Sequence, residues 1–130
     1  MKVLALDYGR ARTGVAVSDP TGTIARPVGV VEQAGSDPGL ARLMQLIAEH
    51  EVERVIVGMP LTLRGERGEQ ARETEAFIET LAGATDVPVV AFDERFTTDL
   101  AEQTPAAAAE DARAAAHLLS SYLVWASARA

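Results

Sequence analysis

Acidic side chains follow two apolar segments of the sequence, at the points where each segment would end as a strand. Asp7 follows residues 3–6, and the pair Asp93 and Glu94 follows residues 87–92. In open α/β sheets, functional groups collect just beyond the carboxyl ends of the parallel strands. An aspartate beside a tight turn can also be a turn former, and for Asp7 alone the two interpretations are evenly matched. Two acidic strand ends in one small sheet favour the functional interpretation.

A third carboxylate would be needed to hold two hard divalent ions, because Mg²⁺ takes only a few carboxylates and keeps several waters. Asp111 is the best candidate, near the start of a helix expected at residues 107–128. Glu110 and Asp111 would also favour a helix N-terminus through the helix dipole alone. The alanines that follow give this helix a slim face, which would let Asp111 approach the strand ends: Ala112, Ala114, Ala115 and Ala116.

The hydrophobic pattern predicts five strands and three helices in the order βββαβαβα. Strands are expected at residues 3–6, 13–18, 28–31, 54–58 and 87–92, and helices near residues 40–47, 66–81 and 107–128. The first three strands are joined by short turns, which favours antiparallel neighbours, whereas strands joined through helices should be parallel with right-handed crossovers. The sequence therefore predicts the α/β class, with a mixed five-stranded sheet flanked by helices.

Two local features add detail to the predicted sheet: one concerns the second strand and the other the fifth. Alternation along residues 13–18 gives one apolar face and one unusually small face, which consists of Gly14, Ala16 and Ser18. Pro88 cannot donate a hydrogen bond to a neighbouring strand, so the fifth strand should begin at an edge or a boundary of the sheet.

Composition places the chain among ordinary globular proteins. It has 130 residues, of which 48% are hydrophobic and 24% charged, and this predicts one domain over residues 1–130. The absence of cysteine excludes disulfides, thiolate metal sites and cysteine nucleophiles, and suits a reducing cytoplasm. No apolar run of membrane-spanning length occurs, and residues 1–6 meet Asp7 too soon for a signal peptide. We therefore expect a cytoplasmic protein without a membrane partner.

The net charge is the one global property that bears on the partner. The chain carries 19 acidic and 12 basic residues, a net charge of −7. Such a surface repels phosphate backbones on average and by itself counts against a nucleic-acid partner.

Five ordered segments resemble one known family. They are residues 4–9 with 12–19, residues 57–61, residues 65–70, residues 93–98 and residues 111–123. Together they resemble the YqgF family, also called RuvX, whose members are described as Holliday-junction resolvases or pre-ribosomal-RNA nucleases with an RNase H-like fold. Each match alone is weak, but the ordered set spans nearly the whole chain and is highly specific.

The resemblance implies an acidic triad of Asp7, Glu94 and Asp111. In the family these residues would bind two Mg²⁺ or Mn²⁺ ions about 3.5–4 Å apart, which activate a water and stabilise the departing 3′-oxygen. The family pattern chooses Glu94 over Asp93. Spacing alone cannot choose, although alternation allows only one of the two to face the site.

The sequence departs from the family between residues 98 and 111. Relatives carry a longer helix and a basic loop here, whereas this chain has residues 99–105 and an alanine run. We therefore expect the substrate to be held weakly.

Several arginines could bind phosphate groups through their paired donors. Arg10 and Arg12 follow Asp7, and Arg95 follows the second acidic pair. Arg64 and Arg67 flank glycines in a segment that could close on a nucleic-acid backbone. Solvated loop charges, or helix ion pairs with the interleaved glutamates, are the alternatives.

These features predict a metal-dependent phosphodiesterase, an endonuclease that acts on structured nucleic acid, with 5′-end processing of pre-16S rRNA as the favoured role. Alternatives are a Holliday junction resolvase, a non-catalytic module that binds ribosomal precursors, and an ATP-binding protein of the actin and sugar-kinase type. An isologous homodimer would suit a two-fold junction substrate. The choice between RNA and DNA stays open, since it depends on contacts to the 2′-hydroxyl and on groove shape.

Overall fold

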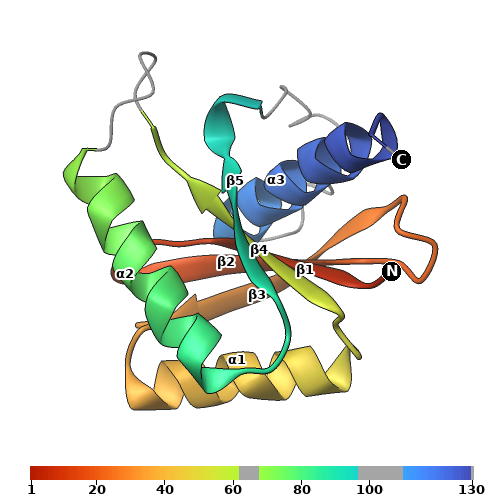
Figure 1. Ribbon diagram of the computed structural model, residues 1–130. Helices are drawn as coiled ribbons and strands as arrows, with labels where there is room; N and C mark the ends of the chain where they lie inside the picture. Colours follow the sequence, from red (N-terminus) through yellow and green to blue (C-terminus); the bar gives the residue numbers. More distant parts are fainter. Residues whose placement is uncertain (62–67, 97–109, 130) are drawn as a thin grey trace.

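The computed structural model describes residues 1–61, 68–96 and 110–129 (Figure 1). The strands are β1 (Val3–Asp7), β2 (Arg12–Ser18), β3 (Ala25–Glu32), β4 (Arg54–Met59) and β5 (Val89–Asp93). The helices are α1 (Asp37–Glu49), α2 (Glu69–Ala84), the short 3₁₀ helix η1 (Glu94–Phe96) and α3 (Glu110–Ser127). Apart from the single turn of η1, the predicted order βββαβαβα is confirmed.

The five strands form one mixed sheet in the order β3-β2-β1-β4-β5. β2 pairs antiparallel with both β1 and β3, whereas β1, β4 and β5 run parallel. Both predictions of strand direction are confirmed, and β5 lies at the sheet edge as Pro88 indicated. The carboxyl ends of β1, β4 and β5 therefore lie along the same side of the sheet, and acidic residues follow at two of them, β1 and β5.

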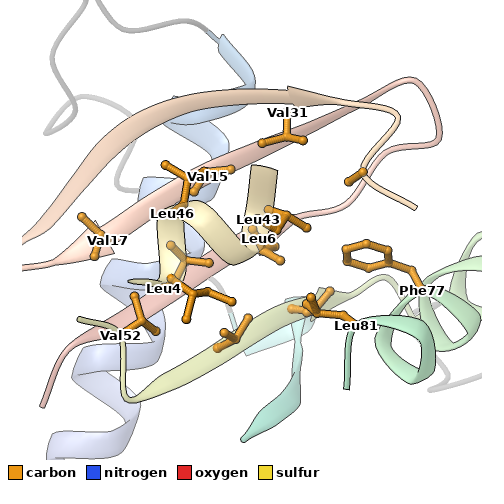
Figure 2. Packing of buried hydrophobic residues seen from close by; sticks show 14 residues of the cluster. Leu4, Leu6, Val15, Val17, Val31, Leu43, Leu46, Val52, Phe77 and Leu81 are labelled. Carbon is orange, nitrogen blue, oxygen red and sulfur yellow. The ribbon is translucent and has the colours of Figure 1, made fainter. Parts of the chain in front are cut away.

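The sheet has a helical layer on each face. Alternate residues of the strands pack against α1 and α2, and Figure 2 shows this cluster, in which Val15 lies beside Leu46 and Leu6 beside Leu43. The intervening residues of the same strands pack against α3 on the other face: Val3, Ala5, Ala16 and Ile56. Because β1 is buried on both faces, its apolar run is continuous rather than alternating.

Aromatic packing connects the second half of α3 to the end of β5. Phe92 meets Tyr122 edge to face with 5.4 Å between ring centroids, and meets Trp125 at 5.7 Å. The Tyr122 hydroxyl accepts a hydrogen bond of 2.9 Å from Nη1 of Arg54 at the start of β4. These contacts fix α3 across the sheet face on which Asp7 projects.

Close packing of α3 depends on small residues, as the sequence predicted. Ala112, Ala115 and Ala116 are buried against the sheet. Ala114 is exposed on the opposite side of α3, so its inclusion in the slim face was wrong. The closest approach is at Gly14 of β2, where a Cβ atom would stand 1.8 Å from the carbonyl oxygen of Asp111. Only glycine at position 14 leaves room for the first turn of α3.

Some element boundaries differ from the prediction. β3 begins at Ala25 rather than residue 28, because an edge strand tolerates Pro27 and a β-bulge at Val15/Ala16 absorbs the change of register. The predicted helix 66–81 is α2 and extends to Ala84. Residues 62–67 and 97–109, which include its predicted start, lie outside the described residues. Among the described helices, none has the length and apolar character needed to cross a membrane.

Replacing Gly14 tests the close approach of α3. Gly14→Ala places a methyl group against backbone atoms of Asp111, which cannot rotate away, so we expect the free energy of unfolding to fall by about 1–3 kcal/mol. Gly83→Ala is the matched control, because its Cβ would meet nothing within 4 Å and alanine favours a helix. Urea denaturation measures both. Equal stability of Gly14→Ala and the wild type would contradict the packing described here.

Candidate active site

Asp7 lies at the carboxyl end of β1 and on the same sheet face as Val3 and Ala5. In the β1–β2 register it stands opposite Gly14, the residue beneath the first turn of α3. Burial raises the pKa of Asp7 above its usual range, and the charge of Asp111 raises it further. Asp7 and Asp111 are therefore close enough to repel one another.

Glu94 follows β5 in η1, and its side chain lies over β4. A Cβ atom at Gly58 would stand 2.6 Å from Oε1 of Glu94 and 3.1 Å from its Cγ, so the missing side chain at position 58 makes room for this carboxyl group. Burial raises the pKa of Glu94 to about 6, with further contributions from the charges of Asp7 and Asp93. Glu94 is thus a half-buried neighbour of Asp7.

Asp93 is occupied by a local ion pair. Nε of Arg95 lies 3.0 Å from Oδ1 and 2.9 Å from Oδ2, and Nη2 lies 2.5 Å from Oδ2. These hydrogen bonds hold the pKa of Asp93 below its usual range. Glu94 rather than Asp93 therefore lies beside Asp7, on the face that alternation assigns to Phe92 and Glu94.

Asp111 occupies the first turn of α3, and its side chain pairs with Arg12. Nε of Arg12 lies 3.2 Å from Oδ2 of Asp111. The Asp111 side chain is 35% exposed and that of Arg12 is 66% exposed. Asp111 thus stands between an anionic neighbour, Asp7, and a cationic one.

Three of the arginines predicted to bind phosphate lie in the described part of the chain, and each has a carboxylate partner. Arg10 forms an ion pair with Glu73 of α2, which together with stacking of Tyr8 on Phe77 fastens the loop after β1 to α2. Arg12 and Arg95 are paired as described above. Arg64 and Arg67 lie outside the described residues.

The sequence did not predict two features of the site. These are the ion pair of Glu73 with Arg10 and the space that Gly58 leaves for the Glu94 carboxyl group. Nothing local in the sequence indicates Glu73, because it lies far along the chain from Arg10. Gly58 did carry a signal, since a glycine inside an apolar strand often marks a close approach by another group.

The chemistry of the three acids fits a hard divalent cation. Carboxylate oxygens are the ligands that Mg²⁺ prefers, and repulsion among half-buried carboxylates falls when such an ion binds. Within residues 1–61, 68–96 and 110–129, no group of three or more His, Cys, Asp or Glu side chains is placed so that it could hold a metal ion. Asp7 lies near both Glu94 and Asp111, but the three carboxylates do not converge on one point.

Two cavities in the described part of the chain lie away from the acids. One of about 720 Å³ lies between the start of β1, the turn at residues 21–23 and the end of α3. The other, about 420 Å³, lies between β3 and the start of α1. Neither cavity therefore marks the candidate site, which is recognised from the positions and charges of Asp7, Glu94 and Asp111.

The mixed sheet in this order, with helices on both faces, is the RNase H-like fold. Among solved structures, Thermus thermophilus RuvC in complex with a Holliday junction substrate superposes with a TM-score of 0.70, covering 98% of this chain and 96% of that one at 18% identity. Residues 1–124 match the model of the family RuvX, Holliday junction resolvase, and the chain belongs to this family.

Curated relatives are similar over most of the chain. A Chloroflexus aurantiacus protein, provisionally named a pre-16S rRNA nuclease, is 46% identical over 101 residues, which are 78% of this chain and 66% of the relative. A Sulfurihydrogenibium protein with the same name is 41% identical over 105 residues, 79% of this chain and 71% of that protein. The aligned part thus spans about two thirds of the first relative.

Replacing Glu94 tests the electrostatic repulsion at the site. The pKa of Glu94 is raised from 4.5 to about 6, so the folded protein binds this proton more tightly than the unfolded chain does. The protonated carboxyl group therefore adds to the free energy of unfolding below pH 4.5, and this contribution is lost as the pH rises through 6. Glu94→Gln removes this loss, so we expect its melting temperature to equal that of the wild type near pH 4.5 and to exceed it above pH 7. Thermal unfolding across this range is the measurement.

Glu79→Gln serves as the control, because Glu79 is an exposed glutamate on α2. A Glu94→Gln variant with the pH profile of the wild type would contradict the raised pKa.

Proposed function

We propose that this protein is a metal-dependent phosphodiesterase, an endonuclease that cleaves structured nucleic acid. One observation carries the proposal: Asp7 and Glu94 are half-buried neighbours beside Asp111, at the edge of the sheet where the parallel strands end. Membership of the RuvX family and the names of the relatives support the same chemistry.

In this proposal Asp7, Glu94 and Asp111 are the catalytic and metal-binding residues. Bound Mg²⁺ or Mn²⁺ would supply an activated water and offset the charge that develops on the scissile phosphate. Asp7, at the end of β1, and Glu94, whose carboxyl group fills the space that Gly58 leaves, would provide metal ligands from the sheet side. Asp111 approaches from the other side, on a helix that Gly14 admits close to the sheet.

The charge of the chain is compatible with such a substrate when the site is loaded. Two divalent ions would change the formal charge from −7 to −3, since each adds two positive charges. We assign phosphate contacts to the arginines that the sequence singled out, namely Arg10, Arg12, Arg64, Arg67 and Arg95. Binding should be weak, local and dependent on the metal.

Pre-16S rRNA is the substrate that the relatives' names favour, and its processing would take place in the cytoplasm. A second candidate is resolution of four-way DNA junctions, favoured by the family description and by the likeness of the fold to RuvC. That role would suit a homodimer, in which two copies of the site face a two-fold symmetric junction.

Replacing Asp7 tests the proposed activity. With Mn²⁺ present, we expect the wild type to cut a labelled rRNA precursor with a 5′ extension faster than a linear RNA or a four-way DNA junction. Asp7→Asn should reduce cleavage to background, because it removes a charged metal ligand. Asp86→Asn is the control, since Asp86 is exposed and precedes β5 at the opposite end of the sheet. Equal cleavage by Asp7→Asn would refute the assignment, and faster cutting of the junction would favour the second candidate.

Replacing Gly58 tests whether the space beside this residue positions the Glu94 carboxyl group, and it leaves every acidic residue unchanged. In Gly58→Ala the added methyl group would meet Oε1 of Glu94 at 2.6 Å and Cδ2 of Leu118 at 3.1 Å, both at the ends of side chains that can shift. The fold should therefore survive while Mn²⁺-dependent cleavage falls roughly tenfold or more. Gly35→Ala is the matched control, because its Cβ would meet only ordinary contact distance, 4.0 Å from Phe77. If Gly58→Ala cleaves at the same rate as Gly35→Ala, the space that Gly58 leaves for Glu94 is not needed for cleavage.

A further inference from the structure

The ion pair between Arg12 and Asp111 joins the start of β2 to the first turn of α3. Of the described arginines near the site, Arg12 is the one whose carboxylate partner belongs to the proposed triad. Arg10 and Arg95 pair instead with Glu73 and Asp93, which lie outside that triad.

The backbone that carries this ion pair is held on both sides, because Arg12 is paired with Glu32 in the sheet and Asp111 packs on Gly14. The carbonyl of Asp111 is packed on Gly14, and the next residue, Ala112, is 2% exposed. The side chains are freer, since that of Arg12 is 66% exposed and that of Asp111 is 35% exposed. Rotation about side-chain bonds is therefore the motion available to Asp111 at this point.

The charges around Asp111 make such a change of partner favourable once a divalent ion binds. Asp111 is close enough to Asp7 to raise the pKa of that group, so an ion held by Asp7 and Glu94 would also attract Asp111. The ion carries twice the charge of the guanidinium and repels it. Arg12 and the metal therefore compete for one carboxylate.

We propose that Arg12 is an exchangeable counter-ion of Asp111, which the metal displaces and which then becomes free to bind a substrate phosphate. This inference rests on the proposed metal-dependent activity and adds an order to it, with metal binding before the phosphate contact. Arg12 is thus a positioning residue that links loading of the metal to capture of the substrate.

Calorimetric titration with Mn²⁺, without nucleic acid, tests the exchange. Arg12→Gln removes the competing charge, so we expect Mn²⁺ to bind roughly three- to tenfold more tightly than to the wild type. Arg12→Lys keeps the charge and should return the affinity toward that of the wild type. The gain in Arg12→Gln should shrink as KCl is raised, because salt screens exposed charges.

Arg10→Gln is the matched control, because it removes a neighbouring arginine whose partner is Glu73, and it should gain less than Arg12→Gln. Mn²⁺ binding to Arg12→Gln that is equal to or weaker than that of the wild type would overturn the exchange and leave the proposed activity standing. A wild type that binds no Mn²⁺ at millimolar concentration would overturn both.

Discussion

The closeness of α3 to the sheet is the constraint on which the rest of the site depends. At Gly14 a Cβ atom would stand 1.8 Å from the carbonyl oxygen of Asp111, so any other residue would push the helix outward. Because Gly14 stands opposite Asp7 in the sheet, this contact also sets the separation of the two acids. Gly58 acts in the same way for Glu94, and two missing side chains thus determine where three carboxylates can lie.

Gathering acids in this way has an electrostatic cost that the neighbouring cations reduce. Burial and mutual repulsion raise the pKa values of Asp7 and Glu94, whereas Arg12 and Arg95 offset the charges of the acids beside them. Carboxyl groups with raised pKa values are typical of functional sites, where buried charge lowers the stability of the fold but serves the reaction. A divalent ion would relieve the same repulsion that makes the site costly.

The elements and their arrangement could be predicted from the sequence, because they follow from local patterns. Buried strands, helical spacing and Pro88 indicated the order, the strand directions and the edge position of β5. The partners of Arg10 and Arg12 could not be predicted, since each of these ion pairs joins distant parts of the chain. The family resemblance chose Glu94 over Asp93, whereas alternation alone left the choice open. In the structure Asp93 pairs with Arg95, and Glu94 lies near Asp7.

Paramagnetic broadening of amide signals by Mn²⁺ tests most directly whether the acids gather around a metal. We expect substoichiometric Mn²⁺ to broaden the amides of Asp7, Gly58, Glu94 and Asp111 first, and to leave those of the turn at residues 21–23 unchanged. Broadening centred on the exposed acids between α1 and β4, or spread evenly over the protein, would contradict the site described here.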